Sequence, residues 1–161
     1  MFKRIFALLC SIALCFSFIS CSRNNGAKYS HCEFVIPLTE DFYKVENKDF
    51  DVSDSTGDYA VAILRISFVA GINEGIPETL TPYEFGRFWV EKCDRVAYVN
   101  DGELAYCEYY DASGVRELYY LEAFFRSRYA YFVVLFAADS EKDDSARSAF
   151  LDYASGVYFT S

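Results

Sequence analysis

The second half of the chain contains a set of aromatic residues together with one arginine and one glutamate, a combination suited to ligand binding. We predict that all of them lie on one face of a set of antiparallel strands. Aromatic rings hold ligands by stacking, and a few polar groups fix the orientation of what is bound. The predicted ligand-binding residues are Tyr109, Arg116, Tyr120, Glu122, Phe124 and Tyr131.

Glu122 distinguishes two interpretations of this aromatic face. In an open groove its carboxylate needs no partner. Beneath a covering helix, a carboxylate in the middle of a sheet needs a partner such as Arg116, because an unpaired buried charge is costly. The first interpretation makes the face a binding site and the second makes it core, and the sequence leaves both open.

The sequence carries no catalytic, metal-binding or cofactor-binding signature. His31 is the only histidine and lies beside a predicted tether, so a histidine base acting on serine or cysteine is not expected. The 24 acidic residues form many pairs without a distinguishing spacing. One series of acidic residues could form either a calcium-binding loop or a solvated loop. It lacks the glycine and the terminal glutamate of an EF-hand. Its members are Asp49, Asp51, Asp54 and Asp58.

Three turn signals predict the strands that hold the aromatic face. They are Asn100-Asp101-Gly102-Glu103, Asp111-Ala112-Ser113-Gly114 and Ser127-Arg128, which separate strand-like runs from Arg95 onward. Read literally, the turns give a register whose pairs are Tyr109–Arg116, Cys107–Leu118, Glu122–Val133 and Phe124–Tyr131. The other face then forms the core, with Leu104, Tyr106, Tyr119, Leu121, Ala123, Phe125, Ala130, Phe132, Val134 and Phe136.

A helix is predicted to begin at residue 82, before these strands. Gly71 to Thr79 has the composition of a loop, Thr81 supplies a cap, Pro82 takes the first helical position and Glu84 closes a capping box. The apolar stripe that follows should lie on the sheet. Its members are Phe85, Phe88 and Trp89.

The remaining elements are a terminal helix and the strands of the first half. Ser140 is expected to cap the helix and Ser155-Gly156 to end it. Tyr59 to Val69 is a long apolar run typical of a central strand, while Cys32 to Ile36 and Phe42 to Val45 suit edge strands. The apolar stripe of the terminal helix is Ala146, Ala149, Phe150 and Tyr153.

This order of elements resembles the PsbP-like family, which includes extrinsic photosystem subunits and the Ran-binding Mog proteins. The resemblance begins at Phe34-Val35-Ile36-Pro37 and Asp41-Phe42-Tyr43 and extends to the final helix, Ser140 to Ala154. It implies an α+β fold, with a central antiparallel sheet of about six strands and helices packed on it. No partner-binding residue of those relatives is matched, so neither function transfers.

The first 21 residues predict export and lipid attachment. Lys3 and Arg4 precede an apolar run, Ile5 to Ile19, that is too short to span a bilayer comfortably. Phe18-Ile19-Ser20-Cys21 resembles the lipobox of bacterial lipoproteins, with Phe18 in place of the usual leucine. Ordinary secretion is the alternative. The predicted organisation is a signal peptide at 1–20, the lipidated Cys21 with a flexible tether at 21–28, and a single domain at 29–161.

The net charge limits the kinds of binding partner, and the number of cysteines limits the disulfide bonds. Without Lys3 and Arg4, thirteen basic residues stand against 24 acidic ones, a net charge of −11. Such a surface repels phosphate backbones and anionic lipid heads, which argues against nucleic-acid binding and against bilayer contact beyond the acyl chains. Cys32, Cys93 and Cys107 allow at most one internal disulfide, and we interpret them as small core residues.

Two functional hypotheses follow from these observations. The first is a non-enzymatic module, lipid-anchored on the extracytoplasmic side of the cell membrane through Cys21, that binds an envelope protein or a small ligand. The second is a hydrolase that acts on envelope glycans or peptides through carboxylates. The absence of a catalytic signature favours the first, and no cofactor or metal is expected.

Overall fold

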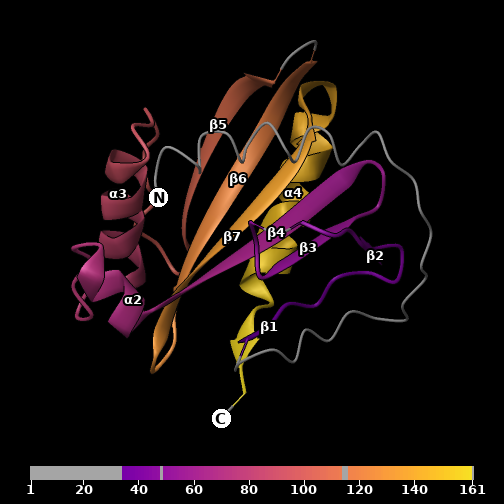
Figure 1. The fold of residues 1–161 in the computed structure, drawn as a ribbon. Helices are drawn as coiled ribbons and strands as arrows, with labels where there is room; N and C mark the ends of the chain where they lie inside the picture. Colours follow the sequence, from indigo (N-terminus) through magenta and orange to yellow (C-terminus); the bar gives the residue numbers. More distant parts are fainter. Residues whose placement is uncertain (1–33, 48, 114–115, 161) are drawn as a thin grey trace.

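A six-stranded antiparallel sheet is the centre of the computed structural model, which describes residues 34–47, 49–113 and 116–160. The strand order is β2-β3-β4-β7-β6-β5 (Figure 1). The bounds are β2 Tyr43–Lys44, β3 Val52–Ser55, β4 Tyr59–Ser67, β5 Ala105–Ser113, β6 Arg116–Arg126 and β7 Ala130–Asp139. The predicted antiparallel sheet of about six strands is confirmed. The signal peptide, Cys21, the tether and Cys32 lie outside the described residues.

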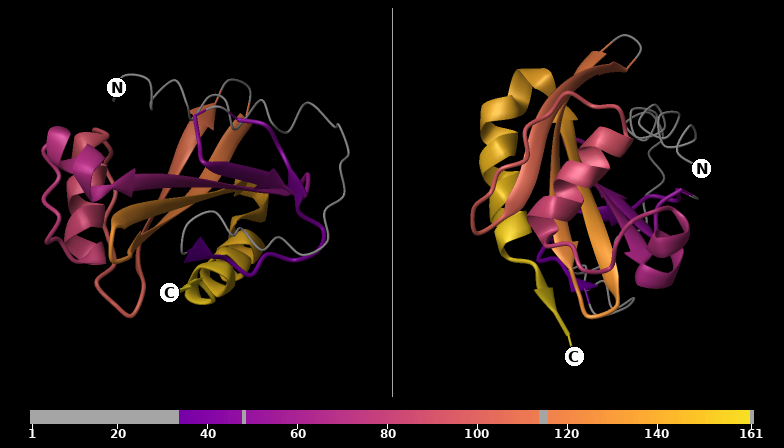
Figure 2. Two further views of the ribbon diagram at one scale, coloured as in Figure 1. Left: turned by 60° about the horizontal axis from the view of Figure 1, so that its bottom comes forward. Right: turned by 90° about the vertical axis from the view of Figure 1, so that its left-hand side faces the viewer.

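Helices cover both faces of the sheet, which makes the fold α+β as predicted. Helix α3, Pro82–Lys92, lies on one face, and helix α4, Asp143–Ser155, lies on the other (Figure 2). A short helix, α2 (Phe68–Asn73), follows β4, and a 3-10 turn, η1 (Ser140–Lys142), precedes α4. Two more short strands, β1 (Phe34–Val35) and β8 (Tyr158–Phe159), pair with each other outside the main sheet.

The face beneath α4 is the predicted core face. Ala146 and Phe150 of α4 are fully buried, and Phe150 stacks on Phe136 with 5.0 Å between ring centroids. Every predicted core-face residue is buried or half-buried there. The prediction succeeded because side chains alternate strictly along a strand, so apolar residues two apart share a face.

The opposite face lies partly beneath α3. The predicted capping box is present: the Thr81 hydroxyl accepts from the Glu84 backbone N–H at 3.2 Å, and the Glu84 carboxylate accepts from the Thr81 N–H at 2.8 Å. Phe85 and Trp89 face the sheet as expected. Helix and sheet approach closely at Gly86, where a Cβ would stand 2.5 Å from a ring carbon of Phe124.

The strand register differs from the prediction by even numbers of residues. Tyr109 lies opposite Tyr120, four residues beyond the predicted Arg116, and Glu122 lies opposite Leu135, two residues beyond the predicted Val133. The turn predicted at 111–114 is misplaced, because β5 continues to Ser113, which pairs with Arg116. An even shift keeps every side chain on its face, which is why the faces are right although the pairs are wrong.

Three further predictions about strands and helix caps also need correction. The strand expected from Arg95 is irregular apart from one bridge between Asn100 and Tyr106. Ser140 does not cap the terminal helix. It begins η1, which is capped by the Asp139 side chain accepting from the Glu141 N–H at 3.3 Å, and α4 follows Lys142 without a side-chain cap. The strand expected to reach Val69 ends at Ser67, which caps α2.

The acidic segment 49–58 is not simply a solvated loop, because it contains β3. Asp54 on β3 is only 2% exposed, and its Oδ1 has no hydrogen-bond partner among the described residues. Burial raises the pKa of Asp54 from 3.8 to about 6. Asp51 instead accepts from the Arg65 N–H at 2.6 Å, and Asp58 pairs with Lys142 at 2.6 Å. The acidic residues of this segment therefore have different surroundings and do not form one site.

We expect Gly86→Ala to destabilise the protein although alanine favours helices. The added Cβ meets the Phe124 ring, and overpacking of this kind costs about 1–3 kcal/mol, which exceeds the helix-propensity gain of up to about 1 kcal/mol. Gly71→Ala in α2 is the matched control, because its Cβ would make only ordinary contacts, the nearest at 3.5 Å. Urea unfolding of the purified variants measures the free energy of unfolding of each. Equal free energies of unfolding for the two variants would contradict the close helix–sheet contact.

Asp54 predicts a pH dependence of stability with a definite sign. Because its pKa is raised in the folded state, the folded protein holds a proton that the unfolded chain loses between about pH 4 and pH 6. This contribution to stability is full below the unfolded pKa and is lost as the pH rises through the folded pKa.

Asp54→Asn should therefore gain stability relative to the unchanged protein as the pH rises from about 4 to about 7, by on the order of 3 kcal/mol. Urea unfolding of both proteins across this range gives the difference, in which all other titrating groups cancel. A constant difference would show that Asp54 does not titrate with a raised pKa.

Candidate functional site

Glu122, the residue that separates the two interpretations of the aromatic face, is buried and paired. Its side chain is 2% exposed, and its Oε1 forms an ion pair with the Arg95 guanidinium, which is 11% exposed. The Tyr109 hydroxyl donates to the same oxygen at 3.2 Å. The Arg95 guanidinium also lies 4.8 Å from the centroid of the Tyr109 ring. The partner that a buried carboxylate requires is thus Arg95, not the predicted Arg116.

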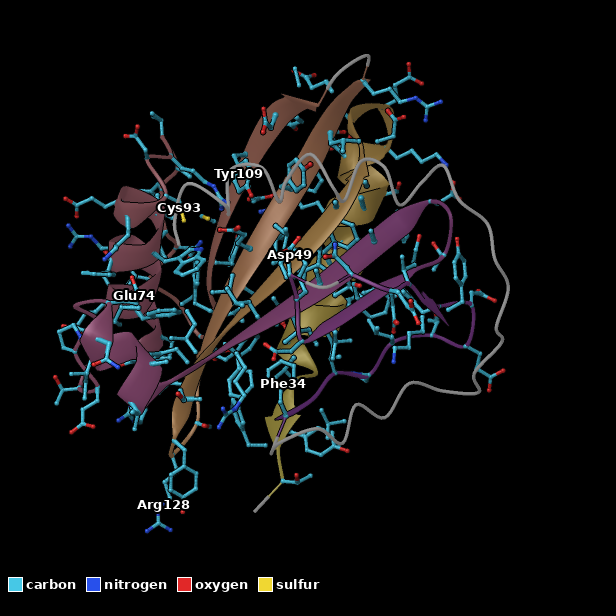
Figure 3. The ribbon with its side chains drawn as sticks, in the orientation of Figure 1. Phe34, Asp49, Glu74, Cys93, Tyr109 and Arg128 are labelled. Carbon is cyan, nitrogen blue, oxygen red and sulfur yellow. The ribbon has the colours of Figure 1, made fainter. Side chains whose placement is uncertain are left out.

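Two tyrosines complete this buried cluster. The rings of Tyr109 on β5 and Tyr120 on β6 stack at 5.1 Å with an interplanar angle of 16°. The Oε2 atom of Glu122 accepts no hydrogen bond from any described residue. Figure 3 places Tyr109 on β5 and Cys93 at the end of α3, two residues before Arg95 in the chain.

The burial of the cluster shifts the pKa of its members. Burial raises the pKa of Tyr109 well above its ordinary value, and the Glu122 charge raises it further. Burial alone would lower the pKa of Arg95, but its interactions with Glu122, Tyr109 and Cys93 together outweigh burial and the pKa is raised. Burial also raises the pKa of the Cys93 thiol to about 11 and that of Cys107 further still. Both cysteines are free and remain thiols, which suits small core residues better than nucleophiles.

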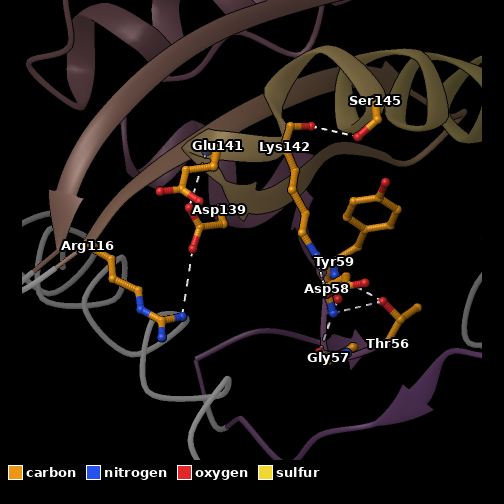
Figure 4. A network of polar contacts seen from close by, with 10 residues as sticks. Thr56, Gly57, Asp58, Tyr59, Arg116, Asp139, Glu141, Lys142 and Ser145 are labelled. Atoms are coloured by element: carbon orange, nitrogen blue, oxygen red, sulfur yellow. Dashed lines mark hydrogen bonds and ion pairs between the residues drawn. The ribbon is translucent and has the colours of Figure 1, made fainter.

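The other sequence-predicted ligand residues lie elsewhere. Phe124 packs edge-on against Phe85 of α3, and Tyr131 stacks on Phe85 at 4.3 Å and donates to the Pro77 carbonyl at 2.8 Å. Both belong to the core beneath α3. Arg116 is 73% exposed and reaches Asp139 at 3.7 Å, near the start of α4 (Figure 4). The structure therefore brings together only Tyr109, Tyr120 and Glu122 of the six, and ligand binding by the set stays a prediction.

An open groove lies on the other side of β5, between this strand and the first turns of α4. Its volume is about 270 Å³. Three tyrosines, three carboxylates and one arginine line it. These residues, which we call the β5–α4 groove, are Glu108, Tyr109, Tyr110, Tyr119, Asp143, Asp144 and Arg147.

Hydrogen bonds order most of the groove. The Arg147 Nε donates to Glu108 Oε1 at 2.8 Å, and the Tyr119 hydroxyl donates to the same oxygen at 2.5 Å. The Tyr110 hydroxyl donates to Asp143 Oδ2 at 2.7 Å. This last bond raises the pKa of Tyr110 to about 12. Helix α4 and strand β5 are thereby held side by side by polar contacts as well as by the core.

The groove keeps an excess of negative charge. Its three carboxylates stand against one guanidinium, and the Asp144 carboxylate accepts no hydrogen bond from a described residue. Tyr110 exposes 52% of its surface. An exposed ring beside an unneutralised carboxylate suits a cationic or hydroxylated ligand group.

Sequence analysis missed this groove, although a signal was present. Tyr106, Glu108 and Tyr110 alternate along β5 and so share a face. Placing the turn at 111–114 cut β5 short. No local pattern indicates that the start of α4 lies beside β5.

Comparisons with known proteins identify the fold. No family model and no curated protein matches the chain. The solution structure of cyanobacterial PsbP (CyanoP) from Synechocystis sp. PCC 6803 matches with a TM-score of 0.56 and 14% identity, covering 89% of this chain and 99% of that one. The domain is therefore PsbP-like in fold, as the order of elements predicted. At this identity the likeness establishes the fold alone.

A second solved structure is similar to a lesser degree. It is LpqN of Mycobacterium tuberculosis, described as involved in cell envelope biogenesis, with a TM-score of 0.43 and 11% identity over 85% of this chain and 90% of that one. Among the described residues, no helix is long and apolar enough to cross a membrane. The same residues contain no cluster of three or more potential metal ligands.

The Arg95–Glu122 pair makes a direct stability prediction. Arg95→Met leaves the Glu122 charge buried without its partner, so we expect a loss of about 3–5 kcal/mol in the free energy of unfolding. Arg116→Met, which breaks only the exposed contact with Asp139, should cost less than about 1 kcal/mol. A double variant, Arg95→Met with Glu122→Leu, should recover part of the loss because no charge remains buried. Equal losses for the two single arginine variants would contradict this assignment.

Proposed function

We propose that the protein is a non-catalytic binding module, anchored by lipid on Cys21 to the extracytoplasmic side of a bacterial cell membrane. Its binding surface is the β5–α4 groove. The partner is a component of the cell envelope, reached across the short tether at residues 22–28. The PsbP-like fold is compatible with this role but does not specify it.

The observation that carries the proposal is the composition of the groove. It is open, it holds about 270 Å³, and its walls combine exposed tyrosine with carboxylates. Tyrosine provides a large contact area at a low entropic cost and is enriched at protein interfaces. A groove of this kind at the edge of a rigid sheet is suited to recognition.

The state of the carboxylates favours binding over hydrolysis. Glu108 is held by Arg147 and Tyr119, and Asp143 accepts from Tyr110. A glycosidase-like mechanism requires two carboxyl groups that both exchange protons or bonds with the substrate. In this groove only Asp144 is without a side-chain hydrogen bond to a described residue.

The sequence-predicted residues retain a supporting role in this proposal. Tyr109 borders the groove, but its ring lies on the opposite face of β5, where it stacks on Tyr120 and donates to Glu122. Tyr120 and Glu122 then act by holding Tyr109. Phe124 and Tyr131 contribute through the core, and Arg116 through its contact with Asp139.

Affinity capture from the bacterium that makes the protein tests the proposal. A groove variant, Tyr110→Ala with Asp144→Asn, should lose at least about tenfold of the captured envelope partner, since exposed aromatic and charged contacts are typical binding determinants. The matched control is Tyr129→Ala with Asp152→Asn, because Tyr129 is 53% exposed against 52% for Tyr110 and Asp152 lies on the same helix as Asp144.

Two further readouts complete this experiment. Cys21→Ala should lose incorporation of labelled acyl chains and leave the membrane fraction, while the groove variant keeps both. Equal capture by the groove and control variants would refute the groove as the binding surface. Turnover of envelope glycans or peptides that disappears with Asp144→Asn alone would instead establish the hydrolase.

A further inference from the structure

Strand β5 is an open edge of the main sheet. It is the last strand in the order β2-β3-β4-β7-β6-β5 (Figure 1). Within the described part of the chain its outer side makes one backbone contact, in which the Asn100 N–H donates to the Tyr106 carbonyl at 2.7 Å. An uncovered strand edge is a template for pairing with a further strand.

The contact with Asn100 identifies the backbone groups that point outward. Because the Tyr106 carbonyl points away from β6, and because the N–H and C=O of alternate residues point to the same side, those of Glu108, Tyr110 and Ala112 also point outward. The pairing of β5 with β6 is continuous from Ala105 to Ser113, so no bulge interrupts the alternation. The backbone groups of these three residues make no hydrogen bond across the outer edge to any described residue.

The same residues connect the open edge to the β5–α4 groove. The side chains of Glu108 and Tyr110 line the groove, and those of Asp143 and Asp144 lie in the same groove on the first turn of α4. A strand laid along β5 would direct every second side chain to this side of the sheet. Those side chains would meet the exposed ring of Tyr110 and the excess negative charge of the groove.

We infer that an extended, lysine- or arginine-rich segment of a partner protein binds here by adding a strand to β5. Backbone hydrogen bonds to Glu108, Tyr110 and Ala112 give the segment its register. Alternate basic side chains enter the β5–α4 groove, where Asp144 provides charge and the exposed Tyr110 ring packs against an alkyl stem. This inference rests on the proposed function and specifies its partner.

Charge decides between a basic partner and a second copy of this chain. Pairing two copies of β5 would bring together Glu108, Asp111 and the acids of the groove from both chains. Like charges at close range oppose such pairing, and the mature chain carries eleven more acidic than basic residues. β5 has neither the lysine nor the proline that often protects an edge strand. Its acidic residues repel another acidic edge and attract a basic one.

Three synthetic peptides test the inference with the purified protein. The first alternates lysine and valine over nine residues, the length of β5. The second replaces lysine by glutamate, and the third keeps lysine but carries N-methyl groups on alternate backbone nitrogens. We expect the first to bind at least about tenfold more tightly than either of the others, because the second loses charge pairing and the third loses about two backbone hydrogen bonds.

Amide hydrogen exchange adds a readout at single residues. The lysine peptide should slow exchange at Glu108, Tyr110 and Ala112, while Tyr109 and Asp111, whose amides face β6, stay unchanged. Ala112→Pro removes one outward N–H without removing a hydrogen bond to β6, so it should weaken binding by about fivefold to tenfold. Asp152→Asn, on the exposed side of α4, should leave binding unchanged.

Several outcomes would overturn strand addition. If the N-methylated peptide binds as tightly as the unmodified lysine peptide, the interaction depends on charge and not on backbone hydrogen bonds. Exchange protection at residues other than the three outward amides would place the peptide elsewhere. Concentration-dependent self-association that Ala112→Pro abolishes would assign the edge to a second copy. If all peptides fail to bind while affinity capture still depends on Tyr110 and Asp144, this inference fails and the proposed function stands. If capture is independent of both residues, the proposed function fails.

Discussion

The ion pair between Arg95 and Glu122 constrains the arrangement of the whole α3 side of the sheet. A carboxylate in the middle of β6, 2% exposed, is tolerated only with a cation beside it. Arg95 provides that cation from the segment that follows α3. The chain leaving the helix is therefore held over the sheet before it enters β5, and the position of α3 is linked to that of the edge strand.

This constraint connects the core to the groove through Tyr109. Glu122 accepts from the Tyr109 hydroxyl, Arg95 lies over the Tyr109 ring, and Tyr120 stacks on it. The strand that carries Tyr109 also presents Glu108 and Tyr110 to the β5–α4 groove. A buried cluster on one side of β5 thus stiffens the proposed binding surface on the other, and a rigid surface loses less entropy on binding.

The sequence predicted the faces of the sheet better than its pairs. Turn signals placed Tyr109 opposite Arg116 instead of Tyr120, yet the error was an even number of residues and left each residue on its proper face. The helix at Pro82 was predictable because its cap is local, involving Thr81 and Glu84 only. The partner of Glu122 was not, since Arg95 is 27 residues away in the chain. The groove likewise joins β5 to α4, and no local pattern in the sequence indicates that contact.

Site-specific photo-crosslinking in intact cells tests the central claim most directly. A photoreactive phenylalanine analogue at position 110 samples the groove beside β5, and the same analogue at the equally exposed position 129 samples the far end of the sheet. The account predicts an adduct from position 110, and none from position 129, with an envelope protein through a lysine- or arginine-rich extended segment. No adduct at position 110, or the same adduct at both positions, would contradict it.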